Sequence, residues 1–174
     1  MYLQEKVCFL DGVSSPCYSG GMNGWKIALY RLWQCTWGLP QTLVGLAMAI
    51  KYRHCPHKRV GGALATLHDG DWGGISLGMF IFVPKGLKPE KEAEYLSHEY
   101  GHTFQSALLG PLYLFAVGIP SFLWANLPRN VRKRSLRHIP YESHYPENWA
   151  EELGHKHFPK VQPSIFSPHP EEKP

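Results

Sequence analysis

The chain has 174 residues, 44% of them hydrophobic, and a formal net charge of +4. This length bounds it to one domain, or one domain with appendages, and the apolar content is enough for a real core. The small positive charge, without any nucleic-acid-binding motif, excludes a dedicated nucleic-acid-binding protein. The four cysteines form no CxxC pair and predict reduced thiols rather than a disulfide framework.

Both ends of the chain predict disorder. Residues 1–24 are polar and Gly/Ser-rich and lack the apolar core of a signal peptide, so they are expected to form a disordered leader. Residues 159–174 form a Pro-rich tail, also expected to be disordered. His155 and His157 are assigned to the tail and not to a metal site.

The first apolar segment, Leu32–Ile50, is uncharged over about the length needed to cross the hydrocarbon core of a bilayer. Two tryptophans lie near one end, and basic residues follow the other end, as in interfacial anchors. The pattern predicts one membrane-associated, transmembrane helix over 25–52, with its basic end on the cytoplasmic side. Gln34 and Gln41 favour the alternative of a buried core helix.

Two β-rich runs follow, at 63–67 and 75–83, separated by a Gly/Asp-rich turn. They predict a β-hairpin immediately before the next helix, with 75–83 as an edge strand that could pair with an extended peptide. Asp69 and Asp71 could indicate a cation-binding loop, but turn chemistry explains them more simply.

A single helix is predicted over about 89–109. Pro89 suits the first helical position, acidic residues occupy the first turn, and Gly110 with the following proline ends the apolar periodicity. Gly101 costs helix stability in the middle of this element. Its presence is explained if another element approaches closely at that point.

The pattern HEYGH lies in the middle of this helix and reads HExxH, the zinc-site signature of metallopeptidases. Residues four apart share a helix face, so His98 and His102 can converge on one Zn²⁺. Glu99 can then accept a proton from a water at the open metal position. A catalytic zinc usually has a third protein ligand, and the extended motif with a third His is absent because position 108 is Leu.

A second apolar stretch, 107–125, is cut by Gly110-Pro111 and by a Gly-Ile-Pro run at 118–120. We expect an apolar hairpin that turns at 118–120 and returns to the same side of the membrane. This topology keeps the basic residues of 129–137 on the side of the first basic cluster. An ordinary buried core segment remains the alternative.

Pro146 and Gly154 bracket a short predicted helix. Glu147 and Glu151 are four apart on it, an arrangement that resembles the second helix of the gluzincin branch of zincin metallopeptidases. The resemblance implies Glu147 as the third zinc ligand and Glu151 as the acid that orients a motif His. The family most often has Asp at the second position. Four other residues remain candidate ligands: Glu151 itself, Glu142, His138 and His144.

The run 77–120, with HEYGHTFQS followed by LLGPLYLFAVGIPS, also resembles a group of small bacterial membrane-associated proteins of uncharacterised function. They carry an HEYGH motif after a single apolar N-terminal helix. This likeness bears on architecture and not on activity.

The predicted fold is therefore α+β: a mainly helical, zincin-like minimal domain over 60–158, with a β-hairpin before the HExxH helix and an N-terminal apolar helix. The predicted function is a membrane-associated zinc metallopeptidase that acts on a peptide or protein substrate, with the metal site on the cytoplasmic side. Glu99 is the general base. An oxyanion helper is expected among Tyr141, His144 and Tyr145. The alternatives are a non-catalytic membrane scaffold or interaction protein that retains a zinc site, and a zinc hydrolase acting on a non-peptide amide or ester.

Overall fold

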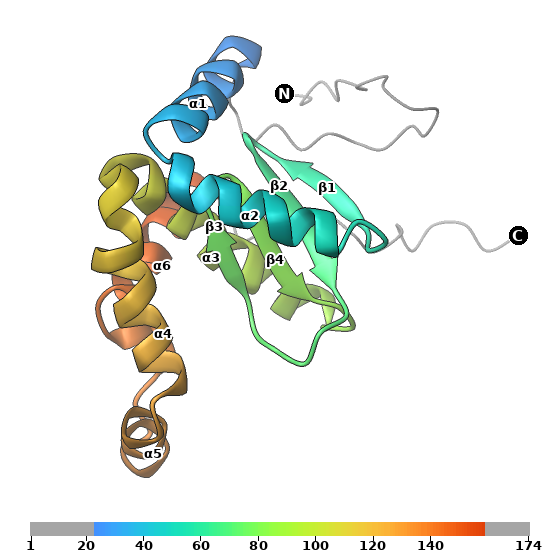
Figure 1. Cartoon of the computed structure of the whole chain (residues 1–174). Helices are drawn as coiled ribbons and strands as arrows, with labels where there is room; N and C mark the ends of the chain where they lie inside the picture. Colours follow the sequence, from blue (N-terminus) through green and yellow to red (C-terminus); the bar gives the residue numbers. More distant parts are fainter. Residues whose placement is uncertain (1–22, 159–174) are drawn as a thin grey trace, which may run out of the picture.

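The computed structural model describes residues 23–158, so the predictions for residues 1–22 and for the tail 159–174 lie outside the described residues. A four-stranded sheet forms the centre of the structure, with α2 (Leu39–Lys51) across one face and α3 (Pro89–Leu109) across the other (Figure 1). Helix α6 (Glu147–His157) packs along α3 on the side away from the sheet. The fold is α+β and mainly helical, as the sequence predicts.

The sheet has the order β1-β2-β4-β3, and its strands are β1 (His57–Val60), β2 (Ala63–His68), β3 (Ile75–Leu77) and β4 (Phe80–Pro84). The predicted hairpin between 63–67 and 75–83 is wrong, because β2 pairs with β4 in parallel. The run 75–83 is itself a hairpin, in which Gly78 adopts φ 63° at the tight turn between β3 and β4. β3 is an edge strand and lies over the middle of α3.

Alternating side chains of the strands supply two cores, because successive residues of a strand point to opposite faces. On β4, Ile81 and Val83 pack with Leu96 and Tyr100 of α3. Phe80 and Phe82 face the other way, toward Tyr52 and the end of α2. The sheet therefore holds α3 in a fixed position, which matters because α3 carries the HExxH residues.

Helix α3 spans Pro89–Leu109, which confirms the predicted helix. Its close approach to α6 explains Gly101, since a Cβ there would collide with the carbonyl oxygen of Ala150. On α6, a Cβ at Gly154 would likewise collide with the carbonyl oxygen of Ser97. Gly154 does not end α6 as predicted; the helix continues to His157, because this glycine serves the helix–helix contact.

The predicted single helix over 25–52 is two helices, α1 (Gly24–Thr36) and α2, separated at Trp37-Gly38. Among the described residues, no single helix has both the length and the apolar composition to cross a bilayer. The two glutamines that interrupt the apolar pattern explain the arrangement. Gln34 Nε2 donates to the carbonyl of Thr103 at 2.9 Å, and Gln41 Nε2 donates to Gly110 O at 2.9 Å. Both amides therefore anchor the N-terminal helices to α3.

Replacing Gln34 by Ala is expected to lower the free energy of unfolding by about 2 kcal/mol, because buried partners on α3 lose their hydrogen bonds. Gln34 is fully buried, and its Oε1 also accepts from Ser106 Oγ at 3.0 Å. Urea unfolding measures the change. Thr36→Ala on the same helix is the control, since this exposed hydroxyl bonds only to carbonyls of its own helix. Equal stability losses in the two variants would contradict the anchoring role.

The second apolar stretch is not a hairpin with its turn at 118–120. The chain bends earlier, through the 3₁₀ turn η1 (Gly110–Leu112), and then runs as the π-helix η2 (Leu114–Gly118) into α4 (Ile119–Asn126). Two consecutive helical segments have, when joined, the length and apolar composition of a membrane span: Pro89–Leu112 and Leu114–Asn126. They are bent by 119° relative to each other. Gly110 allows the bend with φ 53° and packs under the indole of Trp37. Helix α5 (Pro128–Arg137) and the turn η3 (Tyr141–Ser143) then lead back to α6.

Candidate metal centre

Three side chains from two helices converge beside the middle of α3. His98 Nε2 lies 2.9 Å from Glu147 Oε2, and His102 Nε2 lies 3.3 Å from the same oxygen. One ligand atom from each of the three residues lies within 4.8 Å of the other two. Glu147 is fully buried, and the side chain of His102 is 6% exposed and that of His98 13% exposed. The structure thus brings together the three residues predicted as metal ligands, in a group that could hold a metal ion.

The donor set and its dimensions fit zinc. Nitrogen and oxygen ligands at about 2.0–2.1 Å in tetrahedral geometry lie about 3.3 Å from one another. The separation of His102 Nε2 from Glu147 Oε2, 3.3 Å, agrees with that spacing, and the 2.9 Å separation of His98 Nε2 is shorter, as in a hydrogen bond. Glu147 Oε1, the other carboxylate oxygen, is buried and has no hydrogen-bond partner. A buried carboxylate oxygen without a partner is costly unless a cation compensates it.

The other ring nitrogen of each histidine faces an acceptor. His98 Nδ1 lies 3.1 Å from Glu151 Oε2, and His102 Nδ1 lies 2.7 Å from Gln105 Oε1. With the proton on Nδ1, each ring directs the lone pair of Nε2 toward Glu147. Gln105 is held in turn, since its Nε2 donates to the carbonyl of Pro146 at 3.0 Å. Both rings are therefore oriented so that Nε2, once unprotonated, faces the position that a metal would occupy.

The electrostatics of the site favour positive charge. Burial alone would lower the pKa of His98, but hydrogen bonds with Glu147 and Glu151 outweigh it and raise the pKa to about 10. Burial alone would raise the pKa of Glu147, but hydrogen bonds with His102 and His98 hold this pKa far below its usual range. A divalent cation can take the place of the protons that the site otherwise holds.

Glu99 lies beside the two histidines on α3, under the edge strand β3. Ser76 Oγ lies 2.9 Å from Glu99 Oε2 and 2.6 Å from the backbone carbonyl of Glu99. The backbone before β3 also lies against this carboxylate, because a Cβ on Gly74 would collide with Glu99 Oε1. Burial raises the pKa of Glu99, against the opposing effect of His102 and His98. A carboxylate with a raised pKa is a better proton acceptor near neutral pH.

Sequence reasoning missed Gln105 and Ser76. Gln105 follows His102 by three residues, so the helical period places its amide beside the ring, and this spacing could have identified it. Ser76 comes from a strand whose pairing was predicted incorrectly, and no local signal marks it. Tyr113 was also missed; its hydroxyl donates to the carbonyl of Ser76 at 3.1 Å.

The other residues predicted as possible metal ligands or oxyanion helpers differ in how close they lie to the three converging residues. Glu142, His138 and His144 are not among the three converging residues, and Glu151 contacts the far nitrogen of His98. Of the oxyanion candidates, the ring of Tyr141 lies 6.2 Å from that of His98. The other two are engaged elsewhere: His144 packs on Trp124, and the Tyr145 hydroxyl donates to Ala116 O.

The two histidines assigned to the tail belong to α6 instead. His155 Nε2 lies 2.6 Å from Glu151 Oε1, so Glu151 is held between two imidazoles. His157 stacks on Phe104 of α3 with ring centroids 4.3 Å apart. The tail prediction failed here because Gly154 was taken as a helix end.

A second group of metal-binding residue types, His54, Cys55 and Asp69, lies at the end of α2. His54 and Asp69 are exposed, and His54 Nε2 lies 3.2 Å from Asp69 Oδ2. Burial and the Asp69 charge raise the pKa of the Cys55 thiol, which disfavours the thiolate that metals bind. This group is a weaker candidate than the one on α3 and α6.

Replacing Gln105 by Met is expected to lower zinc affinity about 10- to 100-fold, because the side-chain volume is retained and the acceptor for His102 Nδ1 is lost. Competition titration against a chromophoric zinc chelator measures the affinity. Glu152→Gln is the control, since Glu152 is exposed on the first half of α6. Wild-type affinity in Gln105→Met would contradict the orienting role.

No protein-family model, curated protein or solved structure matches the chain. The assignment of the metal centre therefore depends on the residues and their geometry.

Proposed function

We propose that the protein is a zinc-dependent metallopeptidase of the gluzincin type. The observation that carries the proposal is the convergence of His98, His102 and Glu147, with Glu99 buried beside them under an edge strand. Two imidazoles and one carboxylate form the ligand set of several peptidases, and they leave one metal position open. When bound, Zn²⁺ polarises the scissile carbonyl and lowers the pKa of a water molecule at the open position.

The chain's own residues then have distinct tasks. Glu99 accepts the proton of the attacking water on its carboxylate and delivers it to the nitrogen of the leaving group. Ser76 holds Glu99 in place through its hydrogen bond to Oε2. Glu151 and Gln105 orient the two histidine rings.

Tyr141 is the best-placed residue to stabilise the oxyanion. Burial and the nearby charge of Glu147 raise the pKa of its phenol, so it stays protonated and can donate a hydrogen bond. The guanidinium of Arg134 lies over its ring, 5.0 Å from the ring centre.

The edge strand supports a peptide as the substrate. β3 pairs with β4 along one side, and an extended peptide can add to the other side of an edge strand through main-chain hydrogen bonds. The hydroxyl of Tyr113 already donates a hydrogen bond to the carbonyl of Ser76, so this carbonyl is not free to pair with a peptide. The peptide would therefore pair with the part of β3 that precedes Ser76.

Cleavage of a peptide library by zinc-loaded protein, read by mass spectrometry, tests the proposal. We expect cleavage that stops when 1,10-phenanthroline removes the metal and returns on addition of zinc. Hydrolysis of small esters or non-peptide amides without peptide cleavage would identify a different zinc hydrolase. A zinc-loaded protein that hydrolyses none of these compounds would favour the alternative of a non-catalytic scaffold that retains a zinc site.

A further inference from the structure

Helices α1 and α2 have an inverted distribution of polarity. The residues of α1 and α2 that are buried are polar or glycine: Gln34, Gln41, Thr42 and Gly45. Their large apolar side chains face outward instead, and those with more than two fifths of their surface exposed are Trp25, Leu29, Leu32, Trp33, Trp37, Leu39, Leu43, Val44, Leu46 and Ile50. A protein surface in water normally shows the opposite pattern.

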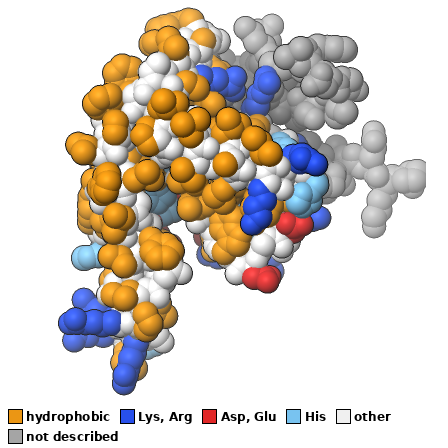
Figure 2. All heavy atoms as spheres, in the orientation of Figure 1, with side chains coloured by type: hydrophobic (Ala, Val, Ile, Leu, Met, Phe, Trp, Pro, Cys, Tyr) orange, Lys and Arg blue, Asp and Glu red, His pale blue; other side chains and the backbone are white. Residues whose placement is uncertain are grey.

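The same surface continues over the end of α3 and the segment that follows it. Its exposed apolar side chains are Leu108, Leu112, Phe115, Ile119, Phe122, Leu123 and Leu127. Figure 2 shows many hydrophobic side chains over α1, α2 and the column formed by η2 and α4, with white atoms of the backbone and other side chains between them. We call this surface the apolar face. It is far larger than a scattered set of exposed hydrophobic residues and requires a partner.

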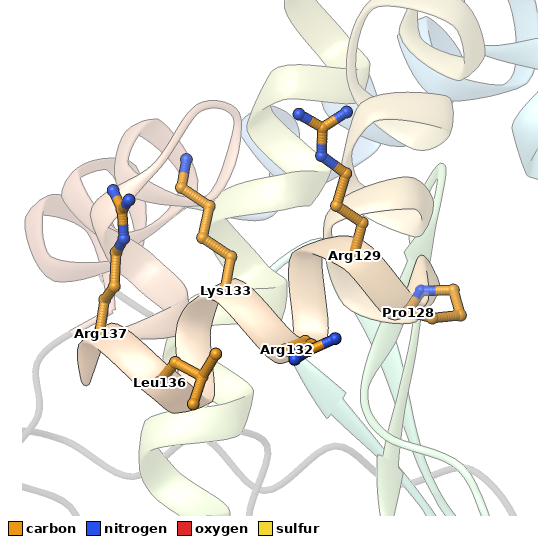
Figure 3. Close-up of a pocket in the computed structure, with 6 residues that line it drawn as sticks. All are labelled: Pro128, Arg129, Arg132, Lys133, Leu136 and Arg137. Atoms are coloured by element: carbon orange, nitrogen blue, oxygen red, sulfur yellow. The ribbon is translucent and has the colours of Figure 1, made fainter.

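The charged residues of the helices α1, α2, α4 and α5 are all positive, since these helices contain no Asp or Glu. α5 follows directly at the lower end of α4 and carries five cations in ten residues, Arg129, Arg132, Lys133, Arg134 and Arg137. Figure 3 shows three of them, four residues apart, pointing to the same side of α5 over a hollow lined by the helix. This row is Arg129, Lys133 and Arg137.

Aromatic side chains complete the pattern. Trp25, Trp33 and Trp37 lie on the apolar face, and the indole N–H of Trp33 donates to the carbonyl of Ala107 at 2.7 Å. Amphipathic aromatic rings and flanking cations are typical of the boundary between lipid acyl chains and headgroups.

We propose that the apolar face lies in one leaflet of an anionic phospholipid bilayer, in the plane of the membrane, with Arg129, Lys133 and Arg137 of α5 against lipid phosphates. The inverted polarity of α1 and α2 favours an acyl-chain environment. The absence of acidic residues from these helices and the basic helix α5 favour an anionic surface over a second copy of this positively charged chain. In this arrangement the protein binds one leaflet of the membrane and no helix crosses the bilayer.

One consequence rests on the proposed peptidase function. α4 presents Ile119 and Phe122 outward, while its Trp124 donates through Nε1 to the carbonyl of Tyr141 at 2.9 Å. The ring of Tyr141 in turn lies 6.2 Å from that of His98. The metal site therefore lies one helix beneath the membrane surface, which favours peptide segments of membrane-bound proteins as substrates.

Vesicle flotation of the full chain tests the proposal, with detergent removed after the protein is mixed with preformed vesicles. We expect binding to phosphatidylcholine–phosphatidylglycerol vesicles and weaker binding to phosphatidylcholine alone. The triple variant Arg129→Gln, Lys133→Gln, Arg137→Gln is expected to bind the anionic vesicles about 100-fold more weakly. The matched control Lys85→Gln, Lys88→Gln, Lys156→Gln removes the same charge from exposed positions outside the face and α5, and is expected to bind normally.

The apolar contribution is tested by Phe115→Ser with Phe122→Ser. Both side chains are at least 66% exposed, so the fold is expected to survive, which circular dichroism and metal content would verify. Binding to both kinds of vesicle is expected to fall at least 100-fold. Wild-type protein that ignores vesicles, or that forms a dimer abolished by the same two substitutions, would overturn the proposal. Because vesicle binding needs neither metal nor Glu99, its outcome is independent of peptidase activity.

Discussion

Replacing Glu99 by Gln is expected to abolish peptide cleavage and to leave the zinc content of the protein unchanged. Glu99 is not among the converging ligand atoms, so its loss does not open the metal site. The amide keeps the shape of the side chain and a hydrogen bond with Ser76, but it cannot accept a proton from water. General acid–base catalysis contributes about 10²–10⁴-fold to rates of this kind, and we expect a loss in that range or larger.

Single-turnover cleavage of a peptide from the library, with zinc measured on the same sample, checks this prediction. Glu94→Gln is the matched control, because Glu94 is an exposed residue of the same helix and only forms a surface ion pair with Lys91. Glu94→Gln is expected to retain wild-type turnover. Substantial cleavage by Glu99→Gln would remove Glu99 from the mechanism, and loss of zinc would give it a structural role.

Replacing Gly101 by Ala is expected to destabilise the protein by about 3 kcal/mol and to lower zinc affinity at the same time. The added methyl group would collide with the backbone carbonyl of Ala150, and a backbone group cannot move without displacing α6. Helix α6 carries Glu147 at its first position, so a displaced α6 also moves the third ligand away from His98 and His102.

Urea unfolding and zinc titration measure the two effects. Gly118→Ala is the control, because it places the same methyl group in a helical segment where the nearest atom beyond the local helix backbone and the chain neighbours is 3.7 Å from the new Cβ. Helix propensity predicts unchanged or slightly higher stability for that variant. If Gly101→Ala behaved like Gly118→Ala, the close contact of α3 with α6 would not be what positions Glu147.

The parts of the fold that follow from local chemistry were predictable. The helix at Pro89–Leu109 has its start and stop signals in the sequence, and the spacing of the HExxH residues puts both histidines on one face. The downstream helix was predicted from Pro146 and Gly154, and the ligand role of Glu147 came from a family resemblance. The structure places the Glu147 carboxylate against both rings.

The remaining parts depend on tertiary contacts that the sequence pattern does not report. Strand β2 pairs with β4 rather than with its neighbour β3, a choice made by packing on α2 and α3. Gln34 and Gln41 were taken as weak points of an apolar helix, yet they are the buried anchors that turn its apolar side outward. Gly154 has the composition of a helix end but serves a helix–helix contact.

Zinc stoichiometry tests the central claim most directly. The protein is stripped of metal, reconstituted with zinc, and analysed by elemental analysis together with His98→Ala, Glu147→Gln and the control Glu152→Gln. The geometry predicts about one zinc per chain in the wild type and in Glu152→Gln, and almost none in the other two variants. A wild type that binds no zinc, or a Glu147→Gln protein that keeps it, would contradict the three-residue site on α3 and α6.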